Sequence, residues 1–300
     1  LARRKRWMTF GGMAIVVLGI LAALWGQHSE ESERPIVIAA KQFSEQYILA
    51  QLIGSRLEAA GYRVEYRDGL GSAVVHSAVA ASSVDISVDY TGTIWANFMK
   101  RADNPGREAM YETIREWEAR QNKVRVFGRL GFENAYAFAM RPDRARELGV
   151  TSLADLVGKG AGLTVGGDPE FFERPEWLAV RDAYGLRFGR TRNFAPTFMY
   201  DALRSGEADV ISAYTSDGRI AADRLVVLAD PKAALPSYDA LLLLSPRIAD
   251  DPGVAAALQP LLGAISVEAM REANFAVDRE DAGKLTPKQA AEALAKKAGL

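Results

Sequence analysis

Residues 84 to 93, VDISVDYTGT, begin as a buried β-strand and continue as a turn that leads into a helix. Apolar and polar residues alternate up to Tyr90, as they do at the end of a strand. Beyond it, two threonine hydroxyls surround Gly92. The phenol of Tyr90 and the hydroxyl of Thr93 therefore lie where a strand is followed by a helix, which is where α/β proteins commonly bind ligands.

The composition is that of a folded globular protein without cysteine chemistry. Of the 300 residues, 49% are hydrophobic and 25% are charged, which suits one large domain or two smaller lobes. The net charge of -1 gives no reason to expect nucleic acid as a partner. Since cysteine is absent, disulfides, thiolate nucleophiles and cysteine-ligated metals are excluded. His28 and His76 lie far apart in the sequence, so we expect no metal site and no cofactor.

The N-terminus has the layout of an export signal. Residues 3 to 6 are all cationic, residues 7 to 25 form an uncharged apolar run, and a polar stretch follows. This order is typical of a secretory signal or a signal anchor. We therefore assign residues 1 to 34 to a signal peptide or membrane anchor plus linker, and we expect a periplasmic or extracytoplasmic protein. Whether residues 7 to 25 are cleaved off or tether the protein to the inner membrane stays open.

From residue 36 onward, short apolar strands alternate with amphipathic helices. Residues 36–40 and 84–90 have the pattern of strands, and residues 44–61 that of a helix ending at a glycine. Such alternation predicts βαβ units and mainly parallel sheets flanked by helices. The sequence thus predicts an α/β fold of two lobes with two crossovers and a cleft between them: lobe I from residues 35–133 and 239–300, and lobe II from residues 134–238.

Four tyrosines fall at strand ends or at the expected crossings between the lobes: Tyr90, Tyr136, Tyr214 and Tyr238. The face of a tyrosine ring attracts cations, most strongly where water is excluded. Several rings together can hold a quaternary ammonium group, which has no N–H to donate. Tyrosine is also common in strands for reasons of packing, so position alone leaves both interpretations open.

Two cations and a hydroxyl accompany these rings. Lys41 directly follows the first strand, Arg174 lies in a loop of the second lobe, and Thr93 follows the strand that ends at Tyr90. The hydroxyl of Thr93 could donate a hydrogen bond. Each also has an ordinary explanation, because most lysines and arginines are solvated surface charges and a threonine can cap a helix.

Seven segments resemble, in order and spacing, the glycine betaine/choline-type substrate-binding proteins of ABC importers. The resemblance runs from about residue 36 to near the C-terminus and implies a type II periplasmic-binding-protein fold. The segments are KQFSEQYILAQL (41–52), GLGSAVVHSAV (69–79), VDISVDYTGT (84–93), ENAYAFAM (133–140), GGDPEFFERPEW (166–177), AYTSDGRI (213–220) and LADPKAALPSYDA (228–240).

The resemblance also implies a ligand and the residues that hold it. Members of the family bind trimethylammonium zwitterions between the lobes in a box of tyrosines, to which the four tyrosines above correspond. Thr93 matches the family's YTGT segment, and Lys41 and Arg174 match the cations that hold the carboxylate in betaine-binding members. Asn134 lies where the family can contact the ammonium methyl groups through a backbone oxygen.

The two cations favour a ligand that carries a carboxylate. Choline has none and would leave Lys41 and Arg174 buried without a partner, which is unfavourable. We therefore expect a glycine betaine-like zwitterion, with choline or another betaine-like ligand as the alternative.

The expected role is binding without catalysis. The sequence shows no nucleophile with a partnered base, which disfavours an enzyme, and no phosphate-loop motif, so a separate ATPase is expected to power the permease. We expect a monomer that delivers its ligand to that ABC permease, with a sensor domain as the remaining alternative. Two further residues are assigned structural roles: Tyr200 in the core and Asp217 as a helix cap.

Overall fold

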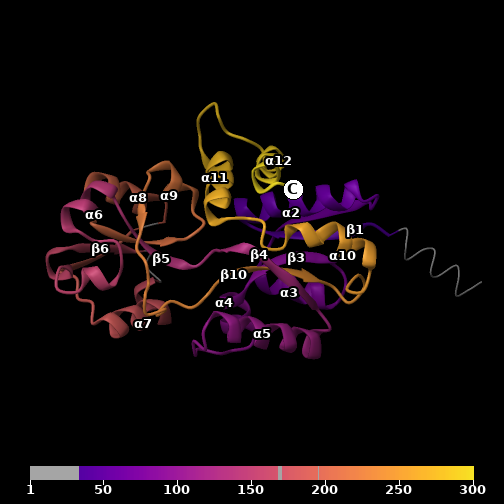
Figure 1. The fold of residues 1–300 in the computed structure, drawn as a ribbon, viewed down its shortest axis with the longest axis horizontal. Helices are drawn as coiled ribbons and strands as arrows, with labels where there is room; N and C mark the ends of the chain where they lie inside the picture. Colours follow the sequence, from indigo (N-terminus) through magenta and orange to yellow (C-terminus); the bar gives the residue numbers. More distant parts are fainter. Residues whose placement is uncertain (1–33, 168–170, 195) are drawn as a thin grey trace, which may run out of the picture.

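The computed structural model describes residues 34–167, 171–194 and 196–300, which form two α/β lobes joined by a narrow waist (Figure 1). The apolar segment 7–25, the predicted signal or anchor, lies outside the described residues. Within the part of the chain that the structure describes, no helix is long and apolar enough to cross a membrane.

The larger lobe is built on a five-stranded sheet with the strand order β2-β1-β3-β10-β4. In it, β1 pairs in parallel with β2 and β3, while β10 pairs antiparallel with β3 and β4. The C-terminal part of the chain thus completes a sheet that the N-terminal part begins. The strands are β1 (Ile36–Lys41), β2 (Val64–Leu70), β3 (Ile86–Tyr90), β4 (Arg125–Glu133) and β10 (Asp239–Leu244).

Helices cover both faces of this sheet because its central strands are apolar on both sides. Along β1, Ile36 and Ile38 face one core, whereas Val37 and Ala39 face the other. Figure 1 shows α2, α10, α11 and α12 on one face, and α3 and α5 on the other. Their bounds are α2 (Ser44–Ala59), α3 (Ser72–Ala80), α5 (Arg107–Trp117), α10 (Pro252–Leu258), α11 (Val267–Asp278) and α12 (Pro287–Ala298).

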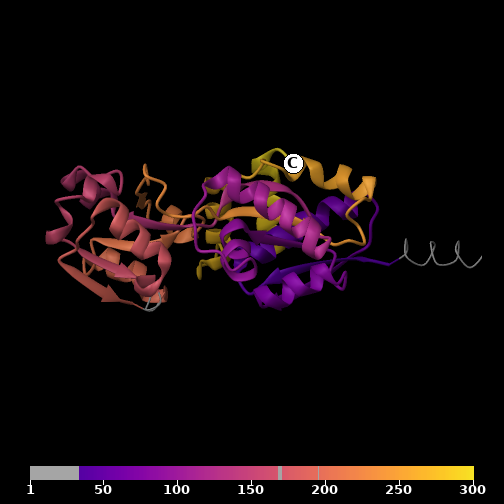
Figure 2. The same cartoon turned by 90° about the horizontal axis from the view of Figure 1, so that it is seen from below.

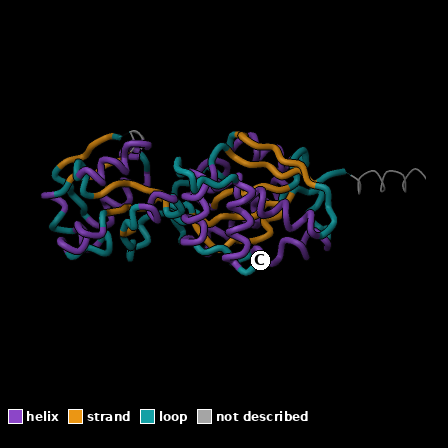
Figure 3. The backbone as a smooth tube through the Cα atoms, turned by 90° about the horizontal axis from the view of Figure 1, so that it is seen from above, coloured by secondary structure: helices purple, strands orange, loops and turns teal. Residues whose placement is uncertain are grey.

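The smaller lobe has a five-stranded sheet with the order β7-β6-β8-β5-β9. Phe138 on β5 faces a core that α7 closes, and its neighbour Ala139 faces a core that α8 and α9 close. Figure 3 shows that both lobes combine strands with helices. The elements are β5 (Tyr136–Met140), α6 (Pro142–Leu148), β6 (Thr164–Gly167), α7 (Pro175–Tyr184), β7 (Arg190–Asn193), α8 (Pro196–Ser205), β8 (Val210–Tyr214), α9 (Gly218–Ala222) and β9 (Val226–Val227).

The two-lobed α/β fold is confirmed, but both sheets are mixed rather than mainly parallel. The difference arises at β10 and β5, the strands that enter their sheets from the other lobe. Each starts at the waist and runs away from it, whereas β3 and β8 end there, so the pairings β10–β3 and β5–β8 are antiparallel. A crossing between lobes therefore reverses strand direction in a way that local sequence patterns do not reveal.

Two α-helices and one strand of the described residues, α6, α10 and β7, were not recognised from the sequence. The residues of β7, Arg190–Asn193, are all exposed, because this strand forms the edge of its sheet. A strand is recognised in a sequence by apolar and polar residues that alternate, and the four polar residues of β7 show no such alternation. Charged residues on an edge strand also discourage pairing with other chains.

Two segments cross the waist side by side (Figure 2). One joins β4 to β5 and the other leads from β9 to β10, and the amide of Asn134 donates to the carbonyl of Tyr238 between them at 3.1 Å. Short crossings of this kind let two lobes move relative to one another while each keeps its own core.

Candidate ligand-binding site

A cleft of about 1160 Å³ lies between the lobes, and residues of both line it. All the residues predicted from the sequence to hold a ligand contribute to its walls, although they come from distant parts of the chain. They are Lys41, Tyr90, Thr93, Asn134, Tyr136, Arg174, Tyr214 and Tyr238.

Three of the four predicted tyrosines form one aromatic group. Antiparallel pairing places Tyr136 on β5 directly opposite Tyr214 on β8, with ring centroids 4.8 Å apart and the Tyr214 hydroxyl donating to that of Tyr136 at 3.0 Å. The ring of Tyr238 meets Tyr136 edge-on at 6.4 Å. Phe171 packs behind Tyr136 at 5.4 Å. Rings in such contact present both faces and edges to the cleft.

Tyr90 belongs to the wall formed by lobe I. It ends β3, is buried, and stacks against Phe43 with ring centroids 6.4 Å apart. Phe43 also lines the cleft, and sequence reasoning missed it. The only signal was its place between the first strand and the first helix, the same kind of position that singled out Tyr90.

Arg174 is held by a carboxylate of the protein itself. Its Nε and Nη2 donate to Glu176 at 3.0 and 2.9 Å, and the guanidinium lies 4.9 Å from the ring centroid of Tyr136. The hydroxyl of Tyr238 donates to the same carboxylate at 2.9 Å. The hydrogen bonds to Glu176 raise the pKa of Arg174, so this side chain stays charged. Arg174, Glu176 and Tyr238 thus form one connected polar group beside the tyrosines.

Lys41 also has a carboxylate partner within the protein. Its Nζ donates to Asp89 at 2.6 Å, and side-chain exposure is 5% for the lysine and 0% for the aspartate. The sequence argument against choline assumed that both cations would be unpaired without a ligand carboxylate. In this conformation both are already paired, so that argument does not hold.

Glu45 was missed by sequence reasoning, yet its carboxyl group lies at the cleft wall. It occupies the first turn of α2 and is buried. Its oxygens accept from the Tyr90 hydroxyl at 2.5 Å, from Asn134 Nδ2 at 3.2 Å and from Asn274 Nδ2 at 3.1 Å. Burial raises its pKa, although these hydrogen bonds act in the opposite direction. An acidic residue four positions after Lys41 was the available signal.

Thr93 completes the lobe I wall, and Gln46 contacts the Tyr90 hydroxyl. Thr93 ends the short helical turn α4 (Thr91–Thr93) and is partly buried at the cleft. Gln46 donates to the Tyr90 hydroxyl at 3.0 Å.

The structural roles predicted for two other residues are confirmed. Tyr200 is buried in the core of lobe II, and Asp217 caps α9 by accepting from the amide of Arg219.

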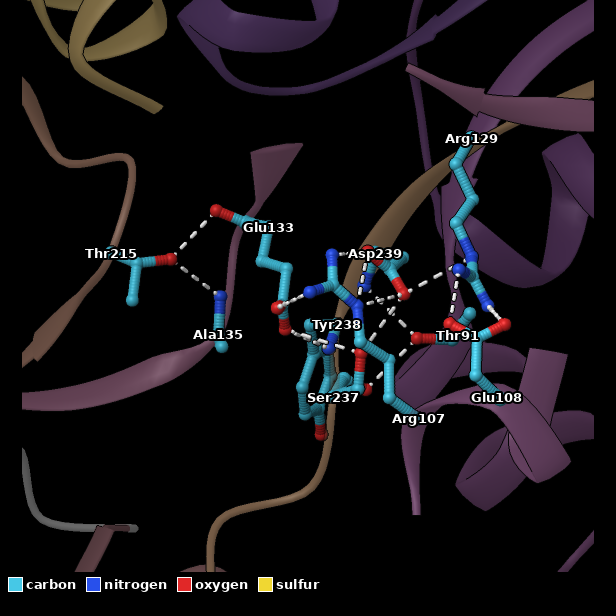
Figure 4. Close-up of polar contacts among 10 residues, drawn as sticks. All are labelled: Thr91, Arg107, Glu108, Arg129, Glu133, Ala135, Thr215, Ser237, Tyr238 and Asp239. Atoms are coloured by element: carbon cyan, nitrogen blue, oxygen red, sulfur yellow. Dashed lines mark hydrogen bonds and ion pairs between the residues drawn. The ribbon is translucent and has the colours of Figure 1, made fainter. Parts of the chain in front are cut away.

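The waist behind the tyrosines is held by polar contacts (Figure 4). Thr215 Oγ1 donates to the carbonyl of Glu133 at 2.6 Å and accepts from the amide of Ala135 at 3.0 Å. The buried carboxylate of Asp239 accepts from Arg107 at 2.5 Å. Such contacts fix the base of each crossing, so that the tyrosines attached to the crossings have defined positions.

The described residues contain no group of three histidine, cysteine, aspartate or glutamate side chains arranged to hold a metal ion. What they do offer is an aromatic group with two paired cations and one buried acid around a single cleft. This combination suits the binding of a small charged organic molecule.

Comparison with known proteins agrees with that reading. Residues 34–297 match the model of the family described as the substrate-binding domain of the ABC-type glycine betaine transport system. The carnitine transport binding protein OpuCC of Listeria monocytogenes is 30% identical over 254 residues, covering 82% of each chain. The ergothioneine transport permease/ergothioneine binding protein EgtU of Helicobacter pylori is 27% identical over 305 residues, 99% of this chain but only 54% of EgtU.

Solved structures give the same result. A glycine betaine/carnitine/choline ABC transporter structure superposes with a TM-score of 0.82 at 26% identity, covering 88% of this chain and 98% of the other. Together with the family match, this likeness confirms the predicted type II periplasmic-binding-protein fold. The chain therefore belongs to the family of substrate-binding domains of ABC-type glycine betaine transport systems.

Proposed function

We propose that this protein captures a quaternary-ammonium zwitterion of the glycine betaine type between its lobes, outside the cytoplasm, and delivers it to an ABC permease. A separate ATPase polypeptide powers transport, and the binding protein acts as a monomer without catalysis. The observation that carries this proposal is the gathering of four tyrosines and two cations from both lobes around one cleft.

The tyrosines take the cationic end of the ligand. Methyl groups of a quaternary ammonium carry the positive charge outward, and each ring face that they touch contributes roughly 0.5–2 kcal/mol when water is excluded. Tyr136, Tyr214 and Tyr238 are already in mutual ring contact. Tyr90 adds a ring from the opposite lobe, so lobe closure completes the cage.

Arg174 takes the carboxylate end. A guanidinium has five N–H groups, and Glu176 uses only those on Nε and Nη2, so further N–H groups remain for a second carboxylate. Its side chain is 34% exposed, compared with 5% for that of Lys41. Lys41 and Thr93 assist from lobe I, and of the two cations Arg174 is the more accessible.

Binding and closure reinforce one another in this scheme. Ligand contacts to both lobes are complete only when the lobes close, so the ligand shifts the population toward the closed state. The two short crossings at the waist supply the hinge for this movement.

The test is isothermal titration calorimetry of the purified 300-residue chain in mild detergent. Glycine betaine, proline betaine, carnitine and choline are titrated separately, and thermal unfolding is followed with each. Binding of at least one carboxylate-bearing ligand with a raised unfolding temperature is expected. If none of the four compounds produced heat or a thermal shift, the proposal would be rejected.

A second candidate is a carboxylate-free cation such as choline. The pairing of Lys41 with Asp89 and of Arg174 with Glu176 favours it, because a site whose cations are already neutralised can accept a monocation without leaving a charge unpaired. The same titration separates the two candidates through the ratio of the dissociation constants for glycine betaine and choline.

A further inference from the structure

The carboxyl group of Glu45 is a buried acid without a cationic partner. All its hydrogen-bond partners are neutral: the Tyr90 hydroxyl donates at 2.5 Å, Asn134 Nδ2 at 3.2 Å and Asn274 Nδ2 at 3.1 Å, and the side chain of Ser216 also hydrogen-bonds to it. Among the described residues, no ion pair includes Glu45, and the nearby Lys41 is paired with Asp89. A buried carboxylate with no counter-charge is unfavourable, so its presence at a ligand cleft calls for a functional reason.

Glu45 also occupies the point where the lobes and the cage meet. The Tyr90 ring belongs to lobe I, while Asn274 on α11 donates both to Glu45 and to the carbonyl of Ser216 at 2.8 Å. Ser216 lies in the turn of lobe II that follows Tyr214. One carboxyl group therefore orients a ring on one wall and, through one amide, is connected to the loop behind a ring on the other wall.

We propose that Glu45 is a positioning and specificity residue of the cation site, whose carboxylate orients the Tyr90 ring and supplies the negative charge that a quaternary ammonium ligand neutralises. This inference rests on the proposed function, since it assigns a role toward the cationic end of that ligand.

Two physical effects act in the same direction. A phenol that donates to a carboxylate has a more electron-rich ring, and an electron-rich ring attracts a cation more strongly. The carboxylate also attracts the ligand directly, and this attraction grows when closure removes water from the cleft. Both effects require the ionised form of Glu45.

The charged groups on the elements packed around Glu45 are engaged elsewhere. Arg271 on α11 donates to the carbonyl of Thr215 at 2.5 Å, and the amide of Tyr238 donates to Glu133 at 3.1 Å. Because these groups are paired elsewhere, protonation of Glu45 is the change that alters the charge next to the Tyr90 ring. Other charged or titratable groups on these elements include Tyr90, the pair Lys41 and Asp89, the pair Asp217 and Arg219, and Asp278, which accepts from Ser44. Further along α2 lie Tyr47, Arg56 and Glu58, and α11 carries Glu268 and Glu272, which pairs with Lys297.

The direction of the pH effect follows from the raised pKa. Burial is the main cause that lifts the pKa of Glu45 above its ordinary value of 4.5. Cation affinity should therefore be full where Glu45 is ionised and should fall as pH is lowered through a range that begins above 4.5. In the same range the ligand-free protein should gain stability from protonation of Glu45, because the neutral form is the one that burial favours.

The experiment compares wild type with Glu45→Gln, using choline and glycine betaine as probes in calorimetry between mildly acidic and neutral pH. Gln preserves size, and Asn134 can turn its amide to accept from it, since its Oδ1 has no partner among the described residues and its Nδ2 donates to Glu45. We expect about tenfold weaker binding of both ligands at neutral pH and a flatter pH profile. The unfolding temperature without ligand should be equal to or higher than that of wild type.

Two controls make the outcome decisive. Glu58→Gln changes an exposed acid on the same helix and should alter neither affinity nor pH profile. Tyr90→Phe removes the phenol hydroxyl, and combining it with Glu45→Gln should cost less than the sum of the two single losses if the carboxylate acts partly through the ring.

Unchanged affinity and pH profile in Glu45→Gln, with wild type binding normally, would overturn the role of Glu45 and leave the proposed function standing. A Glu45→Gln protein that binds weakly because it unfolds at lower temperature would also overturn it, since Glu45 would then serve the fold. If wild type bound none of the probes, the proposed function would fail first and this inference with it.

Discussion

The ring of Tyr238 lies directly against Gly92. A β-carbon built on Gly92 would stand 2.4 Å from Cζ of Tyr238 and within 2.6 Å of two further ring atoms. Such a distance is not tolerated between non-bonded carbon atoms, so glycine is required here for the ring to lie where it does. The glycine of the YTGT segment thus sets the position of a tyrosine that is 146 residues away in the sequence, on the crossing that leads into β10.

Gly92→Ala should displace the Tyr238 ring and weaken ligand binding by roughly tenfold, in line with overpacking penalties of about 1–3 kcal/mol. Calorimetry with glycine betaine measures the loss. The matched control is Gly71→Ala, because a β-carbon at Gly71 meets nothing within 4 Å. Equal affinities of the Gly92 variant and wild type would show that the Tyr238 ring is not part of the binding surface.

Tyr136→Ala and Arg174→Ala should weaken binding by different routes. Loss of the tyrosine ring removes a contact with the ammonium group, so affinity for both glycine betaine and choline should fall about tenfold. Loss of the guanidinium removes charge-assisted hydrogen bonds of about 1.5–3 kcal/mol to the carboxylate, so only glycine betaine binding should fall strongly. Titrating each variant with both ligands checks this, and an equal effect of Arg174→Ala on choline would contradict the assignment of the two ends.

Gly218→Ala should disturb the contact between the lobes at α9 and α11. A β-carbon there would lie 2.4 Å from the backbone nitrogen of Phe275, and a backbone atom cannot move aside by changing rotamer. We expect a loss of about 1–3 kcal/mol in the free energy of unfolding and a larger radius of gyration by small-angle scattering. Gly162→Ala, where a β-carbon meets nothing within 4 Å, is the control. If the radius of gyration and the free energy of unfolding did not change, close packing of α9 against α11 would be contradicted.

Glu176 should make stability depend on pH at the acidic end. Burial acts to raise its pKa, but hydrogen bonds from Arg174 and other groups outweigh burial and hold the pKa below the ordinary 4.5. A depressed pKa means that the stabilisation is present above about 4.5 and is lost as pH falls through the folded-state value. Chemical denaturation at several pH values should show this slope in wild type and a smaller one in Glu176→Gln. If the free energy of unfolding depended on pH equally in the two proteins, Glu176 would be excluded as a cause of that dependence.

Local patterns in the sequence predicted many of the elements but not how strands pair. The apolar run of β1 and the helical spacing of α2 depend on near neighbours in the chain, and both were recognised at nearly their observed bounds. The antiparallel pairing that sets Tyr136 opposite Tyr214 depends on a crossing from the other lobe. Periodicity carries no information about that crossing, so parallel sheets were expected instead.

Partners of charged residues were harder still to predict. The resemblance pointed to Lys41 and Arg174, and both lie at the cleft, but nothing in their spacing showed that Asp89 and Glu176 would neutralise them. Glu45 was not singled out, because an acid in the first turn of a helix is common there and favours the helix N-terminus. Only the packing of α11 and the waist against that turn buries it.

The sequence by itself determined the alternation of strands and helices, the apolar N-terminal run and the chemistry available to a ligand, because these follow from side-chain type and near-neighbour spacing. Tertiary structure alone decided which residues share the cleft, which cations already have partners, and that Glu45 is buried without a counter-charge. Those properties depend on distances between segments far apart in the chain, such as Glu45 and Asn274, which are separated by 229 residues, and only folding brings these segments together.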